Sequence, residues 1–146
     1  MSVVAYVGIG SNVGDAAGNV RRAIAALNDA GRVRGVSPLL RTRPWGRSAQ
    51  PAFVNAVARI ETLLAPQALL AALQRIEVRL GRRPSYHWGP RVIDLDLLLF
   101  DRLRLETPDL SIPHPRLAER PFMLLSLTEV LIPGSRPPAK RSRGVR

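Results

Sequence analysis

The stretch from Val92 to Phe100 constrains the fold most, because it is apolar throughout except for Asp94 and Asp96. Successive side chains of a β-strand point to opposite faces of its sheet, so the two carboxylates share one face. The opposite face carries Ile93, Leu95, Leu97 and Leu99. A membrane span needs about 20 apolar residues, so this segment is too short for one. It predicts a strand with one face in a core and two acids on the other.

The segments before this strand alternate between the periodicities of strands and helices. They comprise a strand over Val3–Val7, a helix over Asp15–Ala30, strands over Val33–Thr42 and Phe53–Leu63, and a helix from Pro66 that Gly81 ends. The order is β-α-β-β-α-β. It predicts an α+β fold, the ferredoxin-like sandwich, whose two helices cover one face of an antiparallel sheet. The other face is left for function.

The remaining segments complete this plan. The glycines of Gly8–Gly14 lack the spacing of a dinucleotide-binding loop, and no lysine follows them as in a P-loop. We therefore interpret this segment as a tight turn from strand to helix. Ser11, Asn12 and Asp15 are typical of residues at the start of a helix. C-terminal additions follow, namely a short hairpin over Asp101–Thr107 and a helix over Arg120–Leu131. We expect one domain over residues 1–132 and a basic, disordered tail over residues 133–146.

The charge of the chain favours an anionic partner such as a phosphate ester, a nucleic acid or a membrane surface. Lysine and arginine number 22 against 11 acidic residues, and Lys140 is the only lysine. Arginine binds phosphate through a planar, bidentate fork. The absence of cysteine excludes disulfides and thiolate chemistry. No basic residue precedes Arg21, so the N-terminus lacks the pattern of a secretory signal, and we expect a cytoplasmic protein.

Asp94 and Asp96 are candidate metal ligands. Aspartate is unfavourable in strands, and two like charges on one face call for a compensating cation. Hard oxygen ligands at neighbouring positions suit Mg²⁺ that completes its coordination with water and phosphate. The alternative is a solvated pair, or a pair neutralised by nearby arginines.

Other residues along the chain are candidates for binding the same ligand. Arg82, Arg83 and Arg91 could reach the same anion, although a solvated basic loop is the alternative. His114, held between two prolines, is a candidate donor to phosphate or a structural histidine. Asn55 could read the edge of a heterocycle. The aromatic residues Trp45, Phe53 and Phe122 could form a slot in which a flat ligand stacks; the alternative is ordinary core packing.

Taken together, these motifs resemble one family, 6-hydroxymethyl-7,8-dihydropterin pyrophosphokinase, from Val4 to about Val130. The resemblance rests on Gly10–Asp15, Arg41–Gly46, Pro51–Ala56, Leu73–Glu77, Trp88–Arg91, Ile93–Leu97 and Ile112–Arg116, in this order and spacing. It implies an ATP-dependent diphosphotransferase of folate biosynthesis (EC 2.7.6.3), with ATP as co-substrate. The hydroxymethyl oxygen of the pterin would attack the β-phosphorus of ATP, and AMP would leave.

The resemblance also implies roles for particular residues. Asp94 and Asp96 would bind two Mg²⁺ ions and, with Arg82 and Arg91, form the catalytic set. The residues expected to bind ATP are Leu70, Gln74, Glu77, Arg82, Arg83, Trp88, Arg91, Leu97, Ser111, His114 and Arg120. Those expected to bind the pterin are Thr42, Pro44, Trp45, Phe53, Asn55, Trp88 and Phe122.

Two other functions fit parts of the pattern. An RNA-binding module can share the strand order and the positive charge, but its strands carry several stacking aromatics and no acidic pair that would repel a phosphate backbone. A nucleotidyl transferase built on Asp94 and Asp96 would release diphosphate rather than AMP. We therefore expect small-molecule partners, a monomer, and neither a membrane nor a specific nucleic acid.

Overall fold

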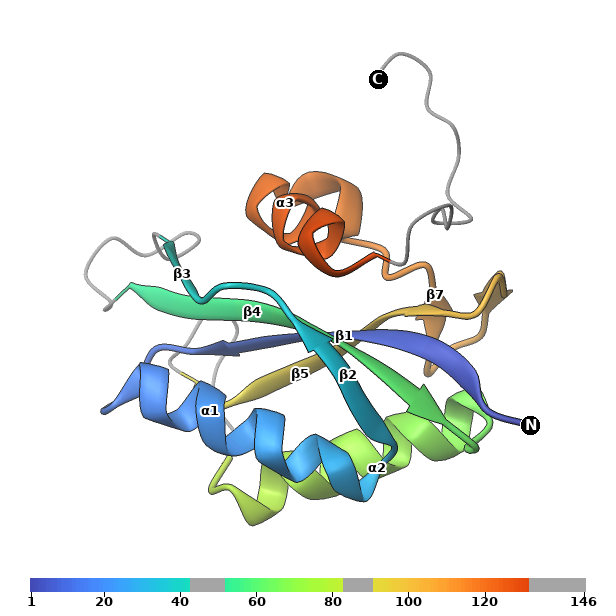
Figure 1. Cartoon of the computed structure of the whole chain (residues 1–146), viewed down its shortest axis with the longest axis horizontal. Helices are drawn as coiled ribbons and strands as arrows, with labels where there is room; N and C mark the ends of the chain where they lie inside the picture. The colour runs from blue at the N-terminus through green and yellow to red at the C-terminus, as the bar shows by residue number, and fades with distance from the viewer. Residues whose placement is uncertain (43–51, 83–90, 132–146) are drawn as a thin grey trace.

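The computed structural model describes residues 1–42, 52–82 and 91–131 (Figure 1). Its strands are β1 (Val3–Ser11), β2 (Arg32–Val36), β3 (Leu40–Thr42), β4 (Phe53–Thr62), β5 (Asp94–Phe100), β6 (Leu105–Glu106) and β7 (Ser111–Ile112). Its helices are α1 (Ala16–Ala26), α2 (Pro66–Arg79) and α3 (Pro121–Val130), with short 3₁₀ turns η1 (Leu27–Asp29) and η2 (Leu117–Glu119). Within these residues no helix is long and apolar enough to cross a membrane.

The main sheet has the strand order β2-β4-β1-β5, and all of its pairings are antiparallel. β3 also pairs with β4, beside the end of β4 opposite to the one that β2 contacts. With α1 and α2 as the two connecting helices, this is the ferredoxin-like α+β arrangement predicted from the sequence. β5 is an edge strand, so one side of its backbone is open to partners outside the sheet.

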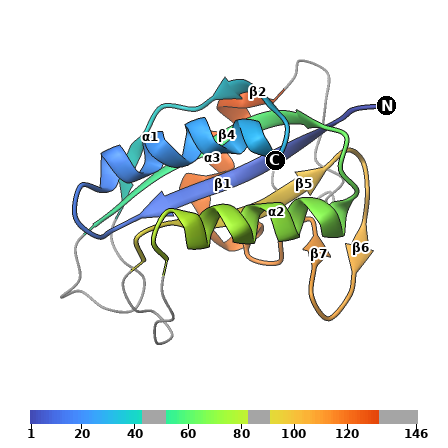
Figure 2. The same ribbon diagram turned by 90° about the horizontal axis from the view of Figure 1, so that it is seen from below.

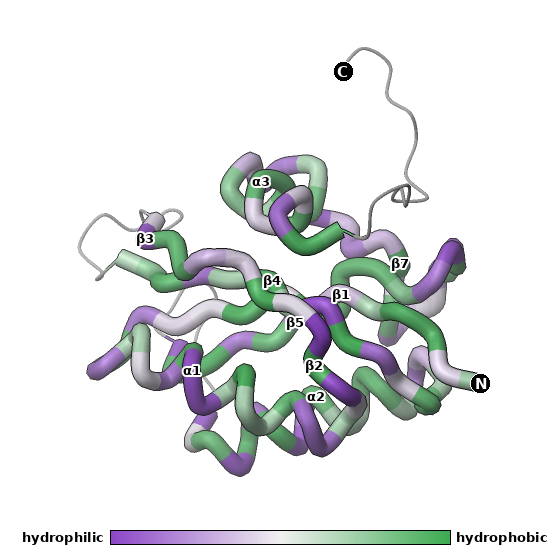
Figure 3. The backbone as a smooth tube through the Cα atoms, viewed as in Figure 1, coloured by the Kyte–Doolittle hydropathy of each residue, from purple (hydrophilic) through white to green (hydrophobic). Residues whose placement is uncertain are grey.

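The helices form layers on both faces of the sheet (Figures 1 and 2). α1 and α2 pack on one face, over a core that includes Val7, Ile60, Leu69 and Leu73. In Figure 3 both helices alternate between hydrophobic and hydrophilic residues, as expected for helices with one packed face. α3 covers part of the other face through a second cluster that includes Tyr6, Val57, Leu98, Met123 and Leu127. The predicted free face is therefore only partly free.

The structure corrects the predicted turn over Gly8–Gly14. β1 continues to Ser11, and the chain turns at Gly14, which has a φ of 63°. The strand glycines are explained by close neighbours on the face that α3 partly covers. A Cβ atom at Gly8 would lie 3.1 Å from Sδ of Met123, and one at Gly10 would lie 2.9 Å from Oδ1 of Asn55. Asp15 does begin α1, since its carboxylate accepts a hydrogen bond from Gly18 N at 3.0 Å.

Two other strand predictions were wrong in detail. The predicted strand over Val33–Thr42 divides into β2 and β3 at Ser37, whose hydroxyl accepts the Val57 N–H at 2.9 Å in place of a backbone carbonyl. The hairpin expected over Asp101–Thr107 lies later, where β6 pairs with β7. Here the Thr107 hydroxyl accepts a hydrogen bond from Leu110 N at 3.0 Å within the connecting turn.

A register shift in β5 overturns the predicted position of Leu99. Val7 lies opposite Leu97 and Tyr6 opposite Leu99, so Leu98 is an extra residue in the ladder. Leu98 and Leu99 therefore both pack in the cluster beneath α3, whereas Leu95 and Leu97 pack toward α1 and α2. The shift begins after Asp96, so the two aspartates keep their predicted common face.

Candidate active site

The sheet register brings the predicted site residues together across β1. Gly10 lies opposite Asn55 of β4 on one side and opposite Asp94 of β5 on the other. Residues directly opposite one another in an antiparallel sheet share a face. Gly8 likewise lies opposite Asp96. Gly8 and Gly10 therefore form a glycine strip, a part of the sheet face without side chains. The Asn55 amide lies on one side of this glycine strip and the acidic pair lies on the other.

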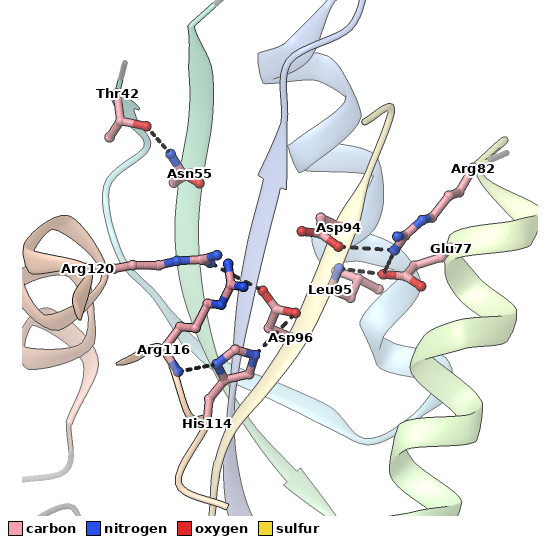
Figure 4. A network of polar contacts seen from close by, with 10 residues as sticks. All are labelled: Thr42, Asn55, Glu77, Arg82, Asp94, Leu95, Asp96, His114, Arg116 and Arg120. Carbon is pink, nitrogen blue, oxygen red and sulfur yellow. Dashed lines mark hydrogen bonds and ion pairs between the residues drawn. The ribbon is translucent and has the colours of Figure 1, made fainter. Parts of the chain in front are cut away.

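The acidic pair is surrounded by arginine and histidine side chains (Figure 4). Nη1 of Arg82 lies 3.0 Å from Oδ1 of Asp94. Asp96 lies 3.7 Å from Nε2 of His114 and 3.8 Å from Nη1 of Arg120. The side chains of Asp94 and Asp96 retain 33% and 25% exposure, so both remain reachable from solvent. An anion that enters this site would meet several positive groups.

The pKa values of the two aspartates are shifted in opposite directions. Burial raises the pKa of Asp94, and the neighbouring charge of Asp96 raises it further against the opposing effects of Arg82, Arg91 and Arg120. Burial also raises the pKa of Asp96, but the hydrogen bond and charge of His114, together with Arg120, outweigh it and hold that pKa below its usual value. Asp96 is thus the more strongly ionised member of the pair.

His114 has a fixed orientation. Its Nδ1 accepts the backbone N–H of Arg116 at 3.1 Å, and its own backbone N–H donates to Leu98 O at 2.9 Å. Because Nδ1 acts as an acceptor, the ring proton of neutral His114 sits on Nε2, the nitrogen that faces Asp96. The side chain is therefore set to donate toward the acidic pair or toward a phosphate beside it.

Glu77 joins α2 to the edge of β5. Its Oε2 accepts the backbone N–H of Leu95 at 2.7 Å and a hydrogen bond from Nη1 of Arg82 at 2.8 Å. Its side chain is only 9% exposed, and burial raises its pKa to about 7 despite these two donors, with the charges of Asp94 and Asp96 adding to the increase. Glu77 thus orients Arg82 next to Asp94.

A pocket of about 310 Å³ opens beside the acidic pair. Four of the predicted ATP-binding residues, Leu70, Leu97, Ser111 and His114, line it together with Asp96. Leu97 is otherwise a core residue, 2% exposed. Glu77 and Gln74 do not line it: Glu77 contacts Arg82 instead, and Gln74 is exposed on α2. Apolar walls beside charged groups suit a nucleotide base next to its phosphates.

Three of the predicted pterin-binding residues, Thr42, Phe53 and Asn55, lie on β3 and β4, across β1 from the acidic pair. Nδ2 of Asn55 donates to the Thr42 hydroxyl at 2.7 Å, which fixes the amide (Figure 4). Phe53 lies beside Asn55 at the position that a Gly10 Cβ would contact, and Phe122 is partly buried against the cluster beneath α3. Four predicted site residues lie outside the described residues: Pro44, Trp45, Arg83 and Trp88.

Asn12 is a site contact that sequence analysis missed. We interpreted it as a helix-start residue, but it is 2% exposed, and its Oδ1 accepts the backbone N–H of Arg91 at 2.8 Å. The available signal was its place in Gly10–Asp15, one of the segments that carry the family resemblance. Local helix-start chemistry accounted for that segment, so its long-range contact went unrecognised.

The donor set fits Mg²⁺, which prefers a few carboxylate oxygens together with water and phosphate. Asp94 and Asp96 share a face and keep partial exposure. Within residues 1–42, 52–82 and 91–131, no group of three or more His, Cys, Asp or Glu side chains is arranged to hold a metal ion. The described residues thus offer such an ion two carboxylates and leave coordination positions for water and substrate.

An acidic pair among arginines and a histidine, on a partly open face of a ferredoxin-like sheet, is typical of enzymes that transfer phosphate groups. The comparisons with known proteins identify the family within this class. The family model described as 7,8-dihydro-6-hydroxymethylpterin-pyrophosphokinase (HPPK) matches residues 6–132. The chain belongs to this family.

Individual relatives agree with that assignment. The chain is 44% identical over 132 residues to the 2-amino-4-hydroxy-6-hydroxymethyldihydropteridine pyrophosphokinase of Bacillus subtilis, covering 89% of this chain and 79% of that protein. The Pseudomonas aeruginosa protein of the same name is 42% identical over 127 residues, with 86% and 78% covered. A solved structure of Plasmodium falciparum HPPK-DHPS has a TM-score of 0.70 at 14% identity; it covers 88% of this chain and 38% of that chain, and it supports the fold.

Proposed function

We propose that this site transfers the terminal diphosphoryl group of ATP to the hydroxymethyl oxygen of 6-hydroxymethyl-7,8-dihydropterin, in folate biosynthesis. The oxygen–β-phosphorus bond forms as the bond from that phosphorus to the α,β-bridging oxygen breaks. The bridging oxygen leaves with AMP, and the hydroxyl proton is released. Membership of the pyrophosphokinase family supports this reaction.

One observation carries the assignment of roles: Gly10 separates Asn55 from Asp94 in the sheet register. A flat heterocycle bound at Asn55 would place its substituent over the glycine strip, toward the acidic pair. The pocket lined by Leu70, Leu97 and Ser111 lies on the far side of Asp96 and suits the nucleoside. The two substrates would then meet with their reacting groups at Asp94 and Asp96.

Within this arrangement the protein acts mainly by positioning and by stabilising charge. The Thr42 hydroxyl accepts a hydrogen bond from Asn55 and fixes the amide that reads the pterin edge. His114 donates from Nε2, and Arg82, Arg91 and Arg120 offer guanidinium groups to the phosphates. Glu77 holds Arg82 at the site. This is the distribution of charge that phosphoryl transfer requires.

Asp94 and Asp96 are the residues that would hold two Mg²⁺ ions. When bound, Mg²⁺ supplies positive charge to the phosphate oxygens. The two aspartates serve this purpose because they face the same side of β5, and because His114 and Arg120 keep Asp96 ionised.

We also propose that the chain works as a monomer in the cytoplasm, where ATP is available, with residues 1–132 as the catalytic domain. The pterin-binding roles of Pro44, Trp45 and Trp88 and the phosphate-binding role of Arg83 belong to the same proposal. The basic tail over residues 133–146 lies outside the described residues, and the proposed reaction assigns it no role.

The experiment is a phosphorus NMR assay of purified protein with ATP, Mg²⁺ and the pterin alcohol. The proposal predicts that AMP and pterin diphosphate accumulate in equal amounts. Release of inorganic diphosphate with a pterin-nucleotide adduct would instead show a nucleotidyl transferase. Intact ATP in the presence of folded protein and saturating Mg²⁺ would refute both.

A further inference from the structure

Asn12 makes a two-point contact with the backbone of Arg91. Its own N–H donates to Arg91 O at 3.0 Å, and its side-chain Oδ1 accepts from Arg91 N at 2.8 Å. A single residue thus satisfies both backbone polar groups of its partner. The Asn12 side chain is 2% exposed, so these bonds are shielded from competing water.

This contact lies beyond the end of the β1–β5 ladder. The last pair in that ladder is Gly10 with Asp94, and residues 91–93 belong to no strand. Within the described residues, no strand pairing holds the backbone at Arg91, and the contact with Asn12 takes that role. The Asn12 side chain therefore takes the place of a strand carbonyl at the point where the chain approaches the acidic pair.

Under the proposed function, the guanidinium group of Arg91 brings its positive charge to the phosphates at that pair. Arg91 lies three residues before Asp94 in the chain, and the Asn12 contact holds its backbone two residues past the Gly10–Asp94 pair of the β1–β5 ladder. A small displacement of the Arg91 backbone would move this charge relative to the phosphates. Reactions that depend on positioned charge lose rate steeply with such displacements.

A second asparagine holds the same turn without touching Arg91. Nδ2 of Asn19 donates to Ser11 Oγ at 3.1 Å and to Val13 O at 2.8 Å. The β1–α1 turn thus has its own support from α1. Asn12 is directed across the sheet instead, toward β5.

We propose that Asn12 is a positioning residue for the proposed diphosphotransferase reaction, and that it acts by fixing the backbone of Arg91 so that the guanidinium group meets the phosphates. This inference rests on the proposed function. It assigns Asn12 no contact with either substrate. The proposal therefore predicts that the effect of Asn12 passes through the side chain of Arg91.

A double-mutant cycle tests that dependence. Asn12→Ala should lower kcat/KM by roughly tenfold or more in the wild-type background. In an Arg91→Ala background the same substitution should change kcat/KM by less than about twofold, because no guanidinium group remains to be misplaced. Asn19→Ala is the matched control and should leave kcat/KM within about twofold of wild type. Thermal melts of all variants report folding separately.

The possible outcomes separate the role of Asn12 from the proposed reaction. Equal losses from Asn12→Ala in both backgrounds, or no loss in either, overturn the role of Asn12 while leaving the proposed reaction intact. Wild-type protein that makes neither AMP nor pterin diphosphate overturns the proposed function itself. If Asn12→Ala does not fold, Asn12→Ser replaces it in the cycle with the same expectation, because a serine hydroxyl is too short to reach Arg91 N.

Discussion

Arg82 and Glu77 are joined by a hydrogen bond of 2.8 Å from Nη1 to Oε2, and the same nitrogen reaches Asp94 at 3.0 Å. One guanidinium nitrogen thus bridges a carboxylate of α2 and a carboxylate of β5. Glu77 also accepts the Leu95 N–H, so its position is fixed from two directions. The bridge couples the packing of α2 to the geometry of the acidic pair.

The burial of Glu77 makes stability depend on pH, because it raises the pKa of this carboxyl group. The pKa of Glu77 is about 7 in the folded state against 4.5 for the unfolded chain. Between these values the folded state binds more protons, so the free energy of unfolding falls as pH rises, by an amount of the order of 3 kcal/mol. Urea denaturation at pH 5 and pH 8 should show this decline in wild type. Glu77→Gln should reduce it while keeping an acceptor for Leu95 N.

The control for Glu77→Gln is Glu106→Gln, which removes an exposed carboxylate on β6. This variant should retain the wild-type dependence of unfolding free energy on pH. A Glu77→Gln protein that loses as much stability between pH 5 and pH 8 as wild type would show that another group is responsible.

Asp96→Asn should lower turnover by about a hundredfold or more and leave the fold intact. The substitution removes the charge that His114 and Arg120 face, but it preserves the size of the side chain. Steady-state kinetics and circular dichroism check the two halves of the prediction. Asp101→Asn is the matched control, because Asp101 lies just after β5 with a φ of 51°, a conformation that asparagine tolerates. Normal turnover by folded Asp96→Asn protein would refute the role of Asp96.

The two glycines of β1 provide a matched pair of substitutions. A Cβ at Gly10 would lie 2.9 Å from Oδ1 of Asn55, so Gly10→Ala should displace that amide and raise the KM for the pterin about tenfold. A Cβ at Gly8 would meet the flexible end of Met123 at 3.1 Å, so Gly8→Ala should change this KM much less. Equal effects of the two substitutions on the KM would contradict the placement of the pterin at Asn55.

Removing the amide itself gives a complementary test. Asn55→Ala should weaken pterin binding by roughly tenfold or more, because an aromatic heterocycle would lose its hydrogen-bonding partner. The affinity for ATP should change little, since the nucleotide pocket lies across β1. Isothermal titration of each ligand separates the two affinities. Asn28→Ala, in the 3₁₀ turn η1 that follows α1, is the control. Loss of ATP affinity in Asn55→Ala comparable to the loss of pterin affinity would contradict the assignment.

Much of the fold follows from local patterns in the sequence. The 3.6-residue stripe over α2, with Pro66 at its start, and the alternation around Asp94 and Asp96 are strong signals that the structure confirms. The exceptions involve long-range contacts. Leu99 lies on the face opposite to the predicted one because β5 shifts register against β1. β1 runs through Gly8 and Gly10, and the nearness of Met123 and Asn55 explains why these two strand positions are glycine.

The candidate site was predictable in its residue types and less so in its connections. Asp94, Asp96 and His114 come together as expected, because one strand and one rigid turn carry them. The contact of Glu77 with Leu95 N depends on β5 being an edge strand, and the contact of Asn12 with Arg91 joins residues far apart in the chain. The periodicity of a single sequence indicates helices and strands, but it predicts neither of these two long-range contacts.

The most direct test of the proposed reaction follows the oxygen that bridges the α- and β-phosphorus atoms of ATP. ATP labelled with ¹⁸O at this position is incubated with Mg²⁺, the pterin alcohol and the protein, and the products are analysed by mass spectrometry. Attack at the β-phosphorus predicts that the label appears in AMP and that the pterin diphosphate is unlabelled. Label in released inorganic diphosphate, with the adenylyl group on the pterin, would contradict the account.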